Sequence, residues 1–207
     1  MRLPRRIIPL ALLALLVPGC TRLGLISSAN GSLVGADSAA VLSPDFRVLV
    51  FARSENDSTA DLYFTDLSDE QIESYFDDSA AWTQISGSIV HVHMFIKPYA
   101  GRTPIQSTAA NASMRWAVLA DGEIGVYTGA GFVFPGRTLL GSKISGSVRG
   151  ATLRLTRATE GFHDPLGPSS LSMSFSAKKD ADMAEGLSRR LDAAARRATK
   201  VAETLEN

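Results

Sequence analysis

Short segments in which apolar residues alternate with polar ones, or run together between turn residues, make up most of the chain from residue 46 to residue 177. This pattern predicts β-strands. The segments are residues 46–53, 62–65, 84–97, 112–134, 144–157 and 170–177. In the last of them, four Ser alternate with apolar residues, as expected of a strand with one covered and one solvated face. We therefore expect an α+β protein that is mainly antiparallel β, either sandwich-like or a strongly curved sheet of about seven strands, with one long C-terminal helix.

A β-hairpin is predicted most clearly within residues 112–134. The dipeptide Asp-Gly at 121–122 favours a type I′ turn, because both of its residues tolerate a positive φ. A loop of these two residues would place Trp116 opposite Tyr127 and Met114 opposite Gly129. Glycines opposite large residues would let a bulky side chain lie across the partner strand.

Two helices are predicted. Residues 68–71 read Ser-Asp-Glu-Gln, which has the form of a capping box for a short helix ending near Phe76. From residue 179 to about residue 206, apolar residues recur at steps of three and four, which indicates one long amphipathic helix with a narrow apolar stripe. This helix would either pack on the sheet or protrude and pair with another chain.

The N-terminus has the form of a secretory signal. Arg2, Arg5 and Arg6 precede a run of eleven mainly apolar residues, Ile7–Val17. That run is too short to cross a bilayer as a helix, which needs about 20 residues. It suits the apolar region of a signal peptide instead.

The residues that follow, Val17-Pro18-Gly19-Cys20, resemble the lipobox of bacterial lipoproteins. The resemblance implies cleavage before Cys20, a diacylglycerol on its sulfur and an acyl chain on its new amino group. In lipoproteins of bacteria with two membranes, an Asp after the Cys favours retention at the inner membrane, and Thr21 stands there instead. The resemblance therefore implies an outer-membrane protein that faces the periplasm. A signal peptide cleaved elsewhere, or an apolar N-terminal helix of a cytoplasmic protein, would be the alternatives.

Composition and the lipobox together predict three parts. Residues 1–19 are the signal peptide, residues 20–44 are the lipidated Cys20 and a tether of small and polar residues, and residues 45–207 are a single β-rich domain with the C-terminal helix. With 45% hydrophobic residues, the 207-residue chain has enough apolar material for a core. Its single Cys excludes an internal disulfide, and equal numbers of basic and acidic residues, 21 of each, argue against nucleic acid as a partner.

The chemistry that the sequence offers centres on its three histidines. His91 and His93 would point to the same side of a strand, as metal ligands do, and His163 could supply a third ligand. Histidines that are merely exposed or partly buried on a strand are the simpler interpretation. No nucleophile motif and no glycine-rich nucleotide loop is present, so we predict no catalytic residue and no cofactor.

The function that these features favour is non-catalytic. We expect a lipid-anchored envelope protein, held at the membrane through Cys20, that binds another envelope protein or a cell-wall component. One alternative is an envelope hydrolase or metal-binding protein that uses His91, His93 and His163. Another is a carrier of an apolar ligand, in a cavity lined by Trp116, Phe132 and Phe134.

Overall fold

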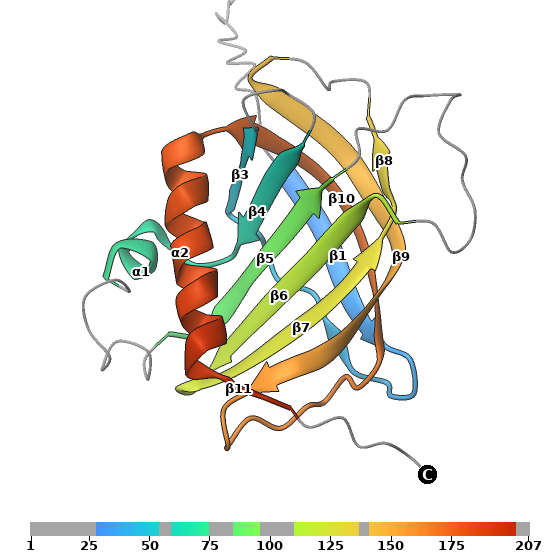
Figure 1. The fold of residues 1–207 in the computed structure, drawn as a ribbon, viewed down its shortest axis with the longest axis vertical. Coiled ribbons are helices and arrows are strands. Elements are labelled where there is room, and N and C mark those ends of the chain that lie inside the picture. Colours follow the sequence, from blue (N-terminus) through green and yellow to red (C-terminus); the bar gives the residue numbers. More distant parts are fainter. Residues whose placement is uncertain (1–27, 54–58, 75–84, 96–109, 137–140, 202–207) are drawn as a thin grey trace, which may run out of the picture.

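The computed structural model describes residues 28–53, 59–74, 85–95, 110–136 and 141–201 (Figure 1). The expected signal peptide, residues 1–19, and Cys20 lie outside these residues. The strands are β1 (Ser28–Gly35), β2 (Val41–Leu42), β3 (Val48–Arg53), β4 (Ala60–Thr65), β5 (Gly87–Met94), β6 (Ala112–Ala120), β7 (Glu123–Gly131), β8 (Val133–Pro135), β9 (Lys143–Ala158), β10 (Ser169–Lys179) and β11 (Thr199–Lys200). The helices are α1 (Asp69–Ser74) and α2 (Ala181–Arg197).

Seven of the strands close into a ring in the order β9-β7-β6-β5-β4-β3-β10, and β10 pairs with β9 again. Every neighbouring pair in this ring is antiparallel except β3 and β10, which run parallel and meet over two residue pairs. Strands β1 and β2 extend the sheet from β10, whereas β8 and β11 lie along β9. The predicted fold, a strongly curved and mainly antiparallel sheet with one long C-terminal helix, is confirmed.

The core has two parts, one inside the ring and one outside it. The interior cluster includes Trp116, Tyr127, Phe51, Phe64 and Phe175. The outer cluster lies where α2 crosses the sheet and includes Val50, Ile89, Val126, Leu187 and Leu191. Helix α2 is thus packed on the sheet rather than protruding, which decides between the two predicted arrangements.

Local sequence signals define several element boundaries. The turn at 121–122 has positive φ at both residues, 51° at Asp121 and 86° at Gly122, and the predicted hairpin register, including Trp116 opposite Tyr127, is confirmed. The capping box also forms, because the backbone N–H of Gln71 donates to the Ser68 hydroxyl at 3.2 Å and the backbone N–H of Ser68 donates to the Gln71 side chain at 2.9 Å. Helix α2 is shorter than predicted, since it ends at Arg197 and the next residues form β11.

The predicted tether differs from the structure from residue 28 onward. Residues 28–35 form β1, which pairs with β10 along eight residues, and Leu33 is fully buried in the interior cluster. The segment looks like a linker because most of its other residues are small or polar. Asn30 lies opposite Ser174 of β10, and Gly31 makes room for the Met173 side chain, which would lie 3.0 Å from a Cβ at that position.

The three aromatic residues of the carrier hypothesis do not share one cavity. Trp116 is fully buried inside the ring and packs against Phe46, with ring centroids 6.0 Å apart. Phe132 and Phe134 form a separate pair at 5.0 Å, and Phe134 borders an open groove on the outside of β8, β9 and β10. Inside the ring, the space around Trp116 is filled by apolar side chains of the protein itself.

Among the described residues, no helix combines the length and the apolar character needed to cross a bilayer.

Candidate metal centre

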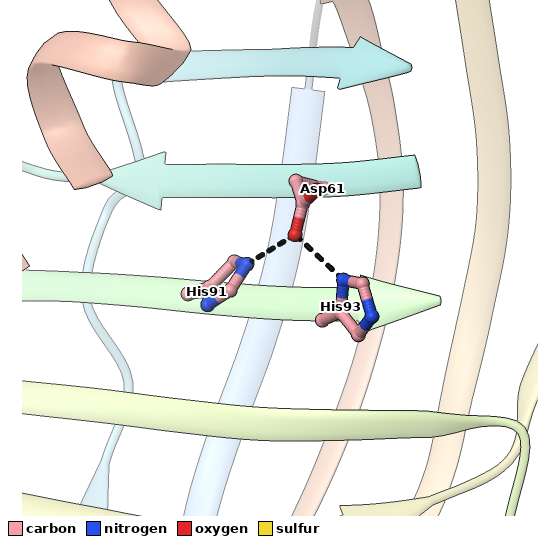
Figure 2. Close-up of side chains that lie close together, drawn as sticks. All are labelled: Asp61, His91 and His93. Atoms are coloured by element: carbon pink, nitrogen blue, oxygen red, sulfur yellow. Dashed lines mark hydrogen bonds and ion pairs between the residues drawn. The ribbon is translucent and has the colours of Figure 1, made fainter. Parts of the chain in front are cut away.

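Two adjacent strands bring a carboxylate and two imidazoles together on the outer face of the ring. In the pairing of β4 with β5, Asp61 lies opposite His93 and Tyr63 lies opposite His91. Side chains two residues apart on a strand share a face, so all four project from the same side of the sheet. Figure 2 shows the Asp61 carboxylate between the two rings.

One oxygen of Asp61 contacts both histidines. The Oδ1 atom is 2.8 Å from His91 Nε2 and 2.8 Å from His93 Nδ1. A carboxylate can only accept hydrogen bonds, so both ring nitrogens donate an N–H to it. The His91 side chain is the most protected, with 15% of its surface exposed, whereas Asp61 and His93 are 36% and 37% exposed. All three side chains are therefore partly exposed to solvent.

The histidines keep the carboxylate ionised. Burial by itself acts to raise the pKa of Asp61, but the hydrogen bonds and the electrostatic attraction of His91 and His93 outweigh it, and the net effect lowers the pKa below its ordinary value of 3.8. At neutral pH the cluster thus contains a negative charge that faces two imidazoles. This is the charge that a cation site requires.

Neighbouring side chains hold His91 in place. The Tyr63 ring stacks on the His91 ring at a centroid distance of 4.5 Å and an interplanar angle of 4°. The Tyr63 hydroxyl forms a hydrogen bond with Ser188 of α2, and burial raises the pKa of Tyr63, so the hydroxyl stays neutral. On the other side of His91, Arg115 of β6 forms an ion pair with Asp192 of α2 at 2.7 Å. The helix and the sheet together therefore fix one face of the site.

The three side chains could hold a metal ion after they adjust their positions. Asp61, His91 and His93 each offer one ligand atom, and these atoms lie within 4.8 Å of one another. A tetrahedral zinc ion with bonds of about 2.0–2.1 Å separates its ligand atoms by about 3.3 Å. The two nitrogen–oxygen distances of 2.8 Å would then each open by about half an ångström, and the two ring nitrogens, which lie within 4.8 Å of each other, would settle at the same separation. Rotation of side chains that are partly exposed can supply that change.

The third candidate ligand beside His91 and His93 is Asp61 rather than His163. The prediction that His91 and His93 share a face is confirmed by their common contact with Asp61. His163 is exposed in the loop between β9 and β10, and the group of possible metal ligands that the described residues form does not include it. The role of its neighbour Asp164 is structural, because Asp164 accepts hydrogen bonds from the Tyr127 hydroxyl at 2.5 Å and from two backbone N–H groups of the same loop.

Asp61 was missed because its role depends on strand pairing. It directly precedes the predicted strand 62–65, and only the register of β4 against β5 shows that it faces His93. The sequence signal that could have indicated Asp61 is an alternating pattern that starts one residue earlier. This pattern places Asp61, Tyr63 and Thr65 on one face of the strand.

Comparison with known proteins gives no relative: no family model, no curated protein and no solved structure matches this chain.

Proposed function

We propose that this protein is a lipid-anchored protein of the cell envelope that binds a divalent transition-metal ion through Asp61, His91 and His93. One observation carries the metal-binding part. Two strands place a carboxylate and two imidazole nitrogens within 4.8 Å of one another on a surface open to solvent.

The donor atoms select the class of metal. Imidazole nitrogen suits zinc, copper, iron and nickel, whereas calcium and magnesium favour sites built from oxygen alone. The two nitrogens and one carboxylate of this site therefore favour a first-row transition metal. Three protein ligands leave at least one coordination position for water or another small ligand.

Metal binding replaces the hydrogen bonds that hold the three side chains in the metal-free protein. His91 Nε2 and His93 Nδ1 carry protons that point at Asp61, and each nitrogen must give up its proton before it can bind a cation. In a neutral imidazole the proton can move to the other ring nitrogen. Tyr63 stays stacked on His91 during this change and keeps the ring oriented.

The anchoring part of the proposal rests on the N-terminal sequence. Residues 17–20 resemble a lipobox, and two or three acyl chains at Cys20 would hold the protein firmly at a bilayer. A metal site on a membrane-held protein of the envelope would take up ions from the periplasm. A non-catalytic binding role toward another envelope component is compatible with both parts.

A titration with Co²⁺ and Zn²⁺ tests the metal site. We expect one ion per chain, with Co²⁺ giving the absorption bands of a low-symmetry site, and we expect Zn²⁺ to displace it. The variants Asp61→Asn, His91→Gln and His93→Gln should each weaken binding by at least about tenfold. The control is His163→Gln, which changes an exposed histidine outside the cluster and should bind as the unchanged protein does. A cluster that binds neither ion, or equal binding by all four variants, would overturn the proposal.

Mass spectrometry of the mature protein tests the anchor. We expect a chain that starts at Cys20 and carries a diacylglycerol and an acyl group. A free thiol at Cys20 would refute this part and leave the metal titration unaffected.

A further inference from the structure

We propose that metal binding at Asp61, His91 and His93 and the docking of helix α2 on the sheet stabilise each other. The inference deepens the proposed function and rests on its metal site. Helix α2 crosses the outer face of the ring over strands β3 to β7, which include the two strands that carry the site (Figure 1). The link between helix and metal runs through His91, whose neighbours on both adjacent strands contact α2.

Tyr63 forms the first link. It lies opposite His91 in the pairing of β4 with β5, and its ring stacks on the His91 ring at a centroid distance of 4.5 Å. Tyr63 is buried in the outer cluster, to which α2 contributes Leu187 and Leu191. Its hydroxyl forms a hydrogen bond with Ser188 of the same helix. The aromatic surface on which His91 rests is therefore positioned by α2.

Arg115 forms the second link, from the other side of His91. It lies opposite His91 in the pairing of β5 with β6, and its guanidinium group is 2.7 Å from the Asp192 carboxylate of α2. Ser188 and Asp192 are four residues apart, so they lie on the same face of the helix, one turn apart. His91 thus lies between two side chains that α2 holds, and release of the helix would free both of them.

The other two candidate ligands have their contacts on β4 and at the end of β5. Asp61 contacts the two histidines through its Oδ1 atom, and the His93 ring lies beside Phe95, which directly follows β5. Within the part of the chain that the structure describes, neither Asp61 nor His93 forms a hydrogen bond, ion pair or ring contact with α2. Helix α2 therefore acts on the metal site through one ligand of the three.

Thermodynamic linkage makes this dependence mutual. A docked helix holds the His91 ring before the metal arrives, so the ring has less conformational freedom to lose on binding. A bound metal must then oppose release of the helix by the same factor by which docking raises the metal affinity. Couplings between two sites are commonly about 5–150-fold. Because α2 holds one ligand of three, we expect a factor near the lower end, about tenfold.

A Co²⁺ titration of helix variants in the mature, full-length protein tests the first half of the inference. The double variant Ser188→Ala/Asp192→Asn removes both links and keeps the buried leucines of α2, so circular dichroism should show a folded protein. We expect it to bind Co²⁺ about tenfold more weakly and to shift the absorption bands of the bound ion, because the His91 ring is less constrained. Ser188→Thr keeps a hydroxyl and should bind as the parent does.

The matched control changes the same helix on its exposed side. Glu185 and Arg189 form an ion pair at 2.9 Å, with 67% and 64% of their side chains exposed. The double variant Glu185→Gln/Arg189→Gln breaks this ion pair one turn from Ser188 and Asp192 and should leave the affinity and the bands of Co²⁺ unchanged.

Hydrogen exchange tests the second half of the inference. The protein is stripped with a chelator and measured with and without saturating Zn²⁺. Amides of residues 187–194 should exchange about tenfold more slowly with Zn²⁺ bound. In the double variant Ser188→Ala/Asp192→Asn at saturating Zn²⁺, this slowing should be lost. Slowing that persists in the variant would show that Zn²⁺ acts on unfolding of the whole protein and not through the two links.

Equal affinity and equal absorption bands in the parent and the variant without links would overturn the inference, as would unchanged exchange in α2 of a parent loaded with Zn²⁺. Failure of the proposed function gives a different result, because a parent without a metal site binds neither ion in the titration itself.

Discussion

Strand β7 approaches β9 so closely at Gly129 that no side chain fits between them. A Cβ atom at this position would lie 1.8 Å from the carbonyl oxygen of Thr152 and 2.9 Å from the Cα of Leu153. Both contacts are with backbone, which cannot rotate away as a side chain can. Gly129→Ala therefore forces β7 and β9 apart by more than an ångström, at a place where the ring is held together by their pairing.

The expected cost follows from known effects of overpacking. Inserting a methyl group into a packed region costs about 1–3 kcal/mol, and a backbone clash falls at the upper end of that range. Replacing Gly by Ala within a strand by itself stabilises the folded protein by about 0.5–1 kcal/mol, because Gly loses more conformational freedom on folding. The net loss should be at least about 2 kcal/mol, or about 4–8 °C in melting temperature for a chain of this size.

Gly31→Ala is the matched control. Its Cβ would lie 3.0 Å from Cγ of Met173, a flexible side chain that can move aside. We expect this variant to stay within about 1 kcal/mol of the unchanged protein. Urea unfolding followed by circular dichroism measures both variants. Equal stability of the two, or a Gly129→Ala variant as stable as the parent, would refute the close approach of β7 and β9.

Two further predictions concern the helix and the cluster. Leu191→Ala should lower the free energy of unfolding by about 2–5 kcal/mol, because Leu191 is fully buried between α2 and the sheet. Val201→Ala, at an exposed position, should lower it little in the same urea unfolding assay. Because the folded pKa of Asp61 lies below the ordinary 3.8, the stabilisation by its carboxylate is present above pH 3.8 and is lost as the pH falls through the folded value. Asp61→Asn should therefore lower the free energy of unfolding at pH 7, whereas in strong acid the variant and the parent should have the same free energy of unfolding. A difference between the two that stays constant with pH would contradict this.

The parts of the fold that were predictable from sequence are those decided by neighbouring residues. The turn at 121–122, the capping box at 68–71 and the alternation in β10 each depend on a few adjacent side chains. The β1 segment was not predictable in this way, because its small residues suit a linker as well as a strand. Only β10, more than a hundred residues later, decides between the two.

The candidate site also has a part that neighbouring residues predict and a part that depends on distant segments. The period of a strand is enough to place His91 and His93 on one face. The third candidate ligand, Asp61, depends on the pairing between β4 and β5, and β-sheet register between separate segments is set by packing of the whole core. The choice of His163 came from residue type alone, and the fold places that residue in a different loop.

The parallel contact between β3 and β10 is the narrowest junction in the ring, with two residue pairs. Helix α2 follows β10 directly, and its cap residue Asp180 donates its backbone N–H to Phe51 of β3 at 3.1 Å. The helix also packs on Val50 of the same strand, so it holds β3 and β10 together at this junction. Opening of the ring by thermal fluctuation should therefore begin with release of the first turn of α2, and amide hydrogens at this junction should exchange with solvent sooner than those in the middle of β6.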